Sequence, residues 1–314
     1  LILDRKDEIR RRDGIEVGRI SRLSSACTDY IQHIRECAGA GDYAGVNQRF
    51  CFDCANGSSA ATARKLFAYL GNGCEFIADE PDGTNINAAC GSTHLENLIA
   101  CVKEKKLDIG IAFDGDADRV LCVDGNGEVV DGDMIMAILA LDMKARGRLK
   151  NNTVIRFCEA NDIRFSATKV GDRYVLEEML LEDYVFGGEQ SGHIIFKDFA
   201  TTGDGQLSAV QLLAHIHRSG KKLSELKTVM TKYPQLIVNI RTSDAAKLAF
   251  YTDDDVRAIL DEGKEKLGDR GRLVVRPSGT EPLIRIMAEG EDEAFTEAIA
   301  RQVAERIEEK LKVY

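Results

Sequence analysis

Three aspartates alternate with small residues in a short stretch between two apolar runs. The stretch reads Asp114-Gly115-Asp116-Ala117-Asp118. Three carboxylates at this spacing would repel one another unless a cation lay among them. Oxygen ligands that leave room for water and a phosphate favour Mg²⁺ over zinc. We therefore predict a metal site formed by Asp114, Asp116 and Asp118, with Mg²⁺ as the cofactor.

Two other interpretations of the aspartates compete with a magnesium site. An EF-hand loop also begins with alternating acids, but it needs Gly at position 6 and Glu at position 12, where this sequence has Arg119 and Gly125. A plain acidic turn is the simpler alternative. Arg119 favours the metal site, because a guanidinium beside a metal can hold a phosphoryl group. We predict that Arg119 is catalytic.

A second loop, residues 276–282, joins a Gly-containing turn to hydroxyl and guanidinium groups. Backbone N–H groups on such a turn, flanked by Arg, form an anion site suited to a phosphate monoester. The alternative is an ordinary turn with Arg on its surface. The predicted phosphate-binding residues are Arg276, Ser278, Gly279, Thr280 and, on the next strand, Arg285.

A third loop runs from Gly188 to His193. Glu189 and Ser191 are two residues apart, so both side chains can face one side of an extended loop and bind sugar hydroxyls. His193 either binds substrate with them or packs as a strand residue. Elsewhere, Cys51 and Cys54 have the spacing of a zinc or redox pair, but no second pair accompanies them.

The order of the apolar segments predicts an α/β fold, with two consecutive α/β domains containing mixed, largely parallel sheets and then a C-terminal α+β domain. Thr93 and Glu96 fit a capping box at the start of a helix. The metal loop then follows a strand at the carboxyl edge of a sheet. The expected domains are residues 21–147 with the metal loop, 148–233 with the sugar loop, and 234–314 with the phosphate loop. Further strands are expected at 153–155 and 165–168, and a helix at 224–233.

The composition excludes several classes of partner. The net charge is −10 and no basic stripe is present, which argues against nucleic acid as a partner. The sequence has no apolar run of 18 residues and no signal peptide, so no membrane is expected. Nine scattered cysteines indicate reduced thiols and a cytoplasmic protein.

The three loops together, in this order, resemble the α-D-phosphohexomutases. D-G-D-A-D-R resembles the metal loop of that family, G-E-Q-S-G-H its sugar loop and R-P-S-G-T-E-P its phosphate loop. The 168–175 stretch, T-K-V-G-D-R-Y-V, most resembles the branch that acts on glucosamine phosphates. The resemblance implies that residues 1–20 are the tail of a first domain that carries a phosphoserine and is otherwise absent. It also implies an apparent gap of roughly ten residues after Ile155.

The resemblance implies an isomerase that interconverts glucosamine 6-phosphate and glucosamine 1-phosphate through a phosphoserine and a bisphosphate, for amino-sugar nucleotide synthesis. Its substrate partner would be a phosphorylated hexosamine. The protein would be either a monomer or a homodimer. Lys169 would be catalytic, and Asp172 and Arg173 would bind substrate. The alternatives are a phosphoglucomutase or phosphomannomutase, a non-catalytic phosphosugar-binding fragment, and a phosphatase with Asp114 as nucleophile.

Overall fold

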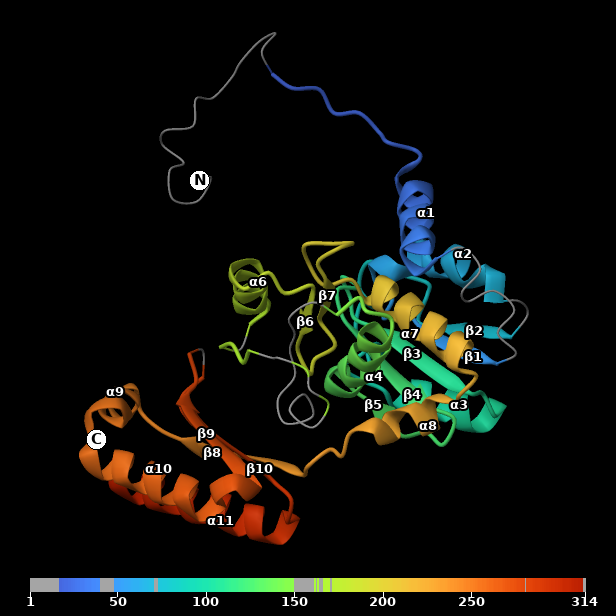
Figure 1. Ribbon diagram of the computed structural model, residues 1–314. Helices are drawn as coiled ribbons and strands as arrows, with labels where there is room; N and C mark the ends of the chain where they lie inside the picture. The colour runs from blue at the N-terminus through green and yellow to red at the C-terminus, as the bar shows by residue number, and fades with distance from the viewer. Residues whose placement is uncertain are drawn as a thin grey trace. The chain divides into compact units, whose positions relative to one another are not determined.

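The computed structural model describes residues 17–39, 48–70, 73–149, 161, 163, 166–169, 171–279 and 281–312. The chain divides into two compact units between Met230 and Thr231 (Figure 1). Each unit has its own hydrophobic core. The strand expected at 153–155 and the proposed gap after Ile155 lie outside the described residues.

The first unit is built on a five-stranded mixed sheet with the order β2-β1-β3-β4-β5. The first three strands are parallel and the last two are antiparallel to their neighbours. The strands are β1 (Phe50–Asp53), β2 (Cys74–Ile77), β3 (Ile109–Phe113), β4 (Val120–Asp124) and β5 (Val129–Val130). The sheet therefore confirms the predicted α/β fold, and the aspartate loop joins β3 to β4.

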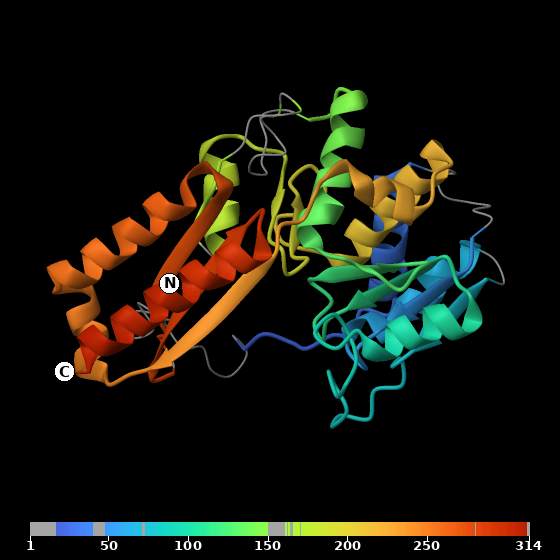
Figure 2. The ribbon, with the colours of Figure 1, turned by 90° about the horizontal axis from the view of Figure 1, so that it is seen from below.

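Helices cover both faces of this sheet (Figures 1 and 2). Phe52 and Ile111 point to the larger layer, and Cys51 and Ala112 point to the smaller one, because side chains alternate along a strand. The larger layer contains α1 (Ala26–Ala38), α2 (Ala63–Phe67), α4 (Gly132–Ala145) and α7 (Gly205–Ser219). The smaller layer is α3 (Glu96–Lys105). Short 3₁₀ segments, Ser58–Ala61 and Ala68–Leu70, flank α2.

The part of the first unit that carries the sugar loop is a two-stranded antiparallel sheet with its helices. Its strands are β6 (Phe186–Gly188) and β7 (Ile194–Phe196). Helix α6 (Asp172–Leu181) precedes them, and α8 (Leu223–Leu226) with a 3₁₀ turn, Lys227–Val229, ends the unit. Asp204 caps α7 by accepting a hydrogen bond from the Leu207 N–H at 2.9 Å.

Three of the predicted elements are wrong in position or type. Helix α3 begins at Glu96 after Leu95, and no side chain caps it, because residues 91–94 form a turn in which the His94 N–H bonds to the Gly91 carbonyl. Residues 166–168 have no strand structure in the expected strand 165–168. The helix expected at 224–233 ends at Val229, and an extended segment follows.

The second unit is a three-stranded antiparallel sheet with helices on one face. The sheet order is β8 (Gln235–Arg241), β10 (Leu283–Gly290), β9 (Gly271–Pro277). The helices are α9 (Asp244–Thr252), which the sequence analysis did not predict, α10 (Asp254–Leu267) and α11 (Glu293–Leu311). Ile284 and Ile286 pack against the helices, and the alternating residues of β10 face away from them. Among the helices that the structure describes, none is long and apolar enough to cross a membrane.

Candidate active site

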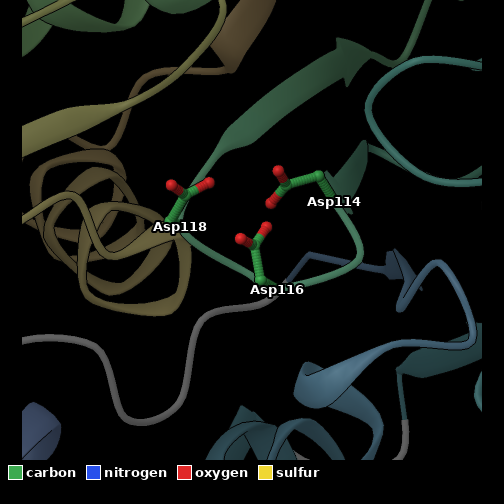
Figure 3. Close-up of side chains that lie close together, drawn as sticks. All are labelled: Asp114, Asp116 and Asp118. Carbon is green, nitrogen blue, oxygen red and sulfur yellow. The ribbon is translucent and has the colours of Figure 1, made fainter. Parts of the chain in front are cut away.

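The three aspartates of the β3–β4 loop point toward one another (Figure 3). One carboxylate oxygen from each residue lies within 4.8 Å of the others. Asp114 is buried, Asp118 is half-buried and Asp116 is exposed. A cluster with one buried and one exposed ligand is open on one side, so a metal held there would keep positions for a substrate oxygen.

Arg119 closes one side of the cluster. Its Nε donates to Asp114 Oδ2 at 2.6 Å and lies 3.5 Å from Asp118 Oδ1. Its backbone N–H also donates to Asp114 Oδ1, at 3.1 Å. Partial burial lowers the pKa of the Arg119 guanidinium, but the neighbouring carboxylates, Asp114 foremost, outweigh it and raise the pKa above its usual range. Arg119 therefore stays charged next to the predicted metal site.

Backbone contacts from three segments fix the shape of the aspartate loop. The Ser58 N–H donates to the Gly115 carbonyl, the Gly205 N–H to the Ala117 carbonyl, and the Ser92 N–H to the Phe113 carbonyl, at 2.8–2.9 Å. A Cβ atom on Gly205 would lie 2.4 Å from the Arg119 carbonyl oxygen. Glycine is thus required where α7 meets the loop.

His193 is a buried residue whose ring contacts Asp118. The ring is 4% exposed, and its Nδ1 lies 3.1 Å from Asp118 Oδ2. Its Nε2 accepts a hydrogen bond from the Gly203 N–H at 3.0 Å. Because Nε2 is an acceptor, a neutral ring carries its proton on Nδ1 and donates it to Asp118. Both nitrogens are used, so the geometry favours a role in positioning Asp118 over contact with sugar.

The sugar loop is joined to the aspartate loop and to two helix N-termini. The Val120 N–H donates to the Gly192 carbonyl at 3.1 Å. Glu189 Oε1 accepts from the Gly171 N–H, at the start of α6, at 3.0 Å. Gln190 Nε2 donates to Asp131, the N-cap of α4, at 3.3 Å. Gln190 therefore supports the fold, and Ser191 is exposed.

The remaining candidates of the first unit lie at the start of α6. Lys169 is exposed, and its Nζ lies 5.9 Å from the centre of the Tyr174 ring. Arg173 Nε pairs with Glu177 at 2.7 Å, and this hydrogen bond raises the pKa of Arg173. Asp172 is exposed in the first turn of the helix. None of these three groups contacts the aspartates among the interactions of the described residues.

The predicted phosphate loop lies at one end of the second unit's sheet. Arg276 and Arg285 are directly opposite each other on β9 and β10, on the face away from the helices. Like charges so placed destabilise a sheet unless an anion joins them. Arg285 pairs with Glu281, whereas Arg276 has no ion pair with any described residue. Ser278 Oγ accepts from the Glu281 N–H at 3.1 Å. Gly279 is exposed, and Thr280 lies outside the described residues.

The residues of the aspartate loop fit a hard cation. Asp118 Oδ1 is buried and accepts no hydrogen bond from the described residues. Arg119 Nε lies 3.5 Å from this oxygen without forming a hydrogen bond to it, so a metal ion in contact with Oδ1 would supply the partner that a buried acceptor needs. The donor set contains only carboxylate oxygens, which suits Mg²⁺ and Ca²⁺ better than zinc.

Cys51 and Cys54 do not form a chelating pair. Cys51 belongs to the core between the sheet and α3, whereas Cys54 belongs to the core on the opposite face. Both thiols are buried and free, and burial is the first cause that raises the pKa of Cys54 to about 12. The zinc or redox interpretation of their spacing is therefore wrong.

The fold and these loops define a class of phosphosugar enzymes: the chain belongs to the phosphoglucomutase/phosphomannomutase family, the α-D-phosphohexomutases. Residues 28–127 match its alpha/beta/alpha domain II, residues 131–233 its alpha/beta/alpha domain III and residues 237–306 its C-terminal domain. The chain is 45% identical to the phosphoglucosamine mutase of Acetivibrio thermocellus, over 99% of this chain and 71% of the relative. It is 44% identical to that of Brevibacillus brevis, over 98% and 69%. The family is one of isomerases, as the sequence analysis predicted.

Solved structures show the same fold. A phosphoglucomutase/phosphomannomutase family protein from Burkholderia thailandensis superposes with a TM-score of 0.73 at 22% identity, over 91% of this chain and 65% of that one. The N-acetylphosphoglucosamine mutase of Aspergillus fumigatus, in complex with GlcNAc-6P and magnesium, superposes with a TM-score of 0.69 at 19% identity, over 90% and 69%.

Proposed function

We propose that the intact protein interconverts glucosamine 6-phosphate and glucosamine 1-phosphate. The observation that carries this proposal is the aspartate cluster with Arg119, held by the sugar loop through His193, in a chain 45% identical to a phosphoglucosamine mutase. In this proposal, the serine that would donate the phosphoryl group would belong to a part of the intact protein outside these 314 residues. A bisphosphate would turn over in the site and return its other phosphate to the serine.

Asp114, Asp116 and Asp118 would hold the metal ion, with Mg²⁺ as our proposal for its identity. A bound Mg²⁺ neutralises charge on the phosphoryl group that is transferred. Arg119 would add a fixed positive charge on the buried side of the same group, since Asp114 keeps its guanidinium in place. His193 would hold Asp118 in the orientation that a metal ligand needs.

The other phosphate of the substrate would bind to the second unit. Arg276 and Arg285, with Ser278, Gly279 and Thr280, would supply charge and hydrogen bonds to a phosphate that does not react. Such remote binding energy orients the sugar for transfer. Glu189 and Ser191 would bind sugar hydroxyls, and Lys169, Asp172 and Arg173 would complete the substrate contacts. We also propose a cytoplasmic location, which fits the free cysteines of the described residues.

The test uses ³¹P NMR to measure turnover by the full-length protein. Phosphopeptide mapping of the same sample locates any phosphorylated serine. We expect Mg²⁺-dependent conversion of glucosamine 6-phosphate and phosphate on one serine upstream of Leu1. Glucose and mannose 6-phosphates serve as controls for the sister activities. If glucose 6-phosphate or mannose 6-phosphate gave a higher kcat/KM than glucosamine 6-phosphate, that sugar phosphate would be the preferred substrate instead. Binding of phosphosugar without turnover by phosphorylated protein would overturn the mutase assignment.

A further inference from the structure

A second loop of the first unit lies against the aspartate loop. Residues 79–90 follow β2, and hydrogen bonds join this loop and the residues that flank it to the segments at the carboxyl ends of β1 and β3. The Asn87 N–H donates to the Ala55 carbonyl at 2.9 Å, and the Asn85 side chain donates to the Glu80 carbonyl at 3.0 Å. Asp82 accepts from the backbone N–H groups of Thr84 and Asn85 at 2.7 and 2.9 Å. These hydrogen bonds fix the shape of the loop.

Asn87 is the polar residue of this loop that lies next to Gly115 of the aspartate loop, beside the apolar side chain of Ile86. An added Cβ on Gly115, which lies between Asp114 and Asp116, would be only 2.7 Å from Asn87 Nδ2. The Asn87 side chain is exposed, and within the described residues its amide forms no hydrogen bond. Asn87 thus places two unused N–H donors beside the peptide that joins two of the predicted metal ligands.

We propose that the Asn87 amide donates a hydrogen bond to a non-bridging oxygen of the phosphoryl group during its transfer at the aspartate loop. This inference rests on the function proposed above. A phosphoryl group in transfer carries its negative charge on these oxygens, so a fixed donor aimed at them stabilises the transition state. Asn87 forms and breaks no covalent bond in this role and exchanges no proton.

A purely structural role for Asn87 makes a different prediction. Its backbone has φ +55°, in the left-handed region where Asn and Gly are favoured. Glycine keeps this conformation and removes only the amide. Asn87→Gly therefore separates the two roles: a backbone role predicts normal catalysis, and an amide role predicts a loss.

The experiment compares Asn87→Gly with Ala89→Gly in the full-length, phosphorylated enzyme. Ala89 lies in the same loop with φ +51°, so it is a matched control for added chain flexibility. We expect Asn87→Gly to lower kcat about 10- to 100-fold, as the loss of a hydrogen bond to a charged group does. The dissociation constant for glucosamine 1,6-bisphosphate, measured by calorimetry with Mg²⁺, should rise at least fivefold. The dissociation constant for Mg²⁺ alone should stay within twofold, and so should all three values in Ala89→Gly.

Asn87→Asp is a second test variant. It retains the shape and the left-handed preference of Asn but replaces the donor with a negative acceptor, so it should lose more activity than Asn87→Gly. Normal kcat and bisphosphate affinity in Asn87→Gly would overturn the inference while leaving the mutase function intact. Absence of turnover by the wild-type enzyme would instead overturn the proposed function.

Discussion

At the scale of single residues, the three aspartates differ in what else they do. Asp114 is buried and bonded to Arg119, whereas Asp116 is exposed and forms no hydrogen bond or ion pair with the described residues. Asp116→Asn should therefore weaken Mg²⁺ binding and change the free energy of unfolding by no more than about 0.5 kcal/mol. Asp114→Asn should weaken Mg²⁺ binding and also lower the free energy of unfolding by about 3 kcal/mol, because Arg119 loses the charged acceptor of its hydrogen bond. Calorimetric Mg²⁺ titration and urea unfolding measure the two effects; equal stability losses would contradict this division.

His193 offers a second prediction at this scale. His193→Ala removes the donor to Asp118 and should weaken Mg²⁺ binding by about 10- to 100-fold, as loss of a group that orients a metal ligand does. His193→Asn places an amide donor near the position of Nδ1 and should restore part of the affinity. His217→Ala, on the exposed side of α7, is the control. If the Asn variant binds Mg²⁺ no better than the Ala variant, the proposed role of His193 is wrong.

The sequence predicted that the three aspartates lie close together, because alternate positions on one short loop bring their carboxylates near one another. It did not predict the role of His193, since the Gly203 N–H that fixes its ring is ten residues away on a separate turn. Asn87 was also missed. Its loop carries ordinary turn residues, and only the fold brings its amide to Gly115.

At the scale of elements, apolar runs predicted the strands of the five-stranded sheet, whereas the strand expected at 165–168 and the helix starts were predicted less well. Thr93 and Glu96 have the spacing of a capping box, but tertiary contacts hold residues 91–94 as a turn at the sheet edge. The short helix α9 was missed, although Ser243 caps it by accepting from the Ala246 N–H at 3.1 Å. Local patterns indicate buried strands reliably, but neighbouring segments decide where a helix begins.

Gly192 joins two elements at close range. A Cβ there would lie 2.1 Å from the Val120 carbonyl oxygen, and φ is +91°. Gly192→Ala should cost about 3 kcal/mol, from backbone strain and overlap together. Gly220→Ala is the matched control, because φ is +64° with open space around the position, and it should cost only about 1 kcal/mol. Thermal unfolding of the two variants tests the difference; equal losses would exclude the overlap as a cause.

An ion cluster between α4 and α7 makes stability depend on acid. Burial alone would raise the pKa of Asp142, but His215 and Arg218 bond to it and help lower the pKa to about 2. A carboxyl with a lowered folded pKa stabilises the protein above its unfolded pKa of about 4, and this stabilisation is lost as pH falls toward 2. Asp142→Asn should cost roughly 2 kcal/mol at pH 7.

The difference in free energy of unfolding between Asp142→Asn and the wild type should become smaller as the pH falls below 4. Urea unfolding at pH 7, 4.5 and 3.5 measures it. Glu309→Gln, on the exposed side of α11, is the control and should show no such trend. If the free energies of unfolding of Asp142→Asn and the wild type differed by the same amount at every pH, this cluster would not be the cause of the acid sensitivity.

At the scale of the whole molecule, each unit has a core of its own, so each should unfold cooperatively. Ile111 is fully buried in the first unit and Ile286 in the second. Each Ile→Ala change should cost about 2–5 kcal/mol in its own unit. Differential scanning calorimetry of the full chain should show two transitions, with each variant lowering only one. A single calorimetric transition that both variants lower would mean that the two units unfold together. The finer division at residues 21–147, 148–233 and 234–314 stays our proposal.

The contacts of Gly203 and Gly205 with His193 and Ala117 have a consequence for protein synthesis. The aspartate loop leaves the ribosome first, and His193, which holds Asp118, follows 75 residues later. Until residues 203–205 have been added, His193 Nε2 and the Ala117 carbonyl lack the backbone N–H groups of Gly203 and Gly205 that bond to them in the folded protein. A nascent chain stopped before residue 203 should thus carry all three acids and yet bind Mg²⁺ weakly, so the site matures only when translation has passed that point.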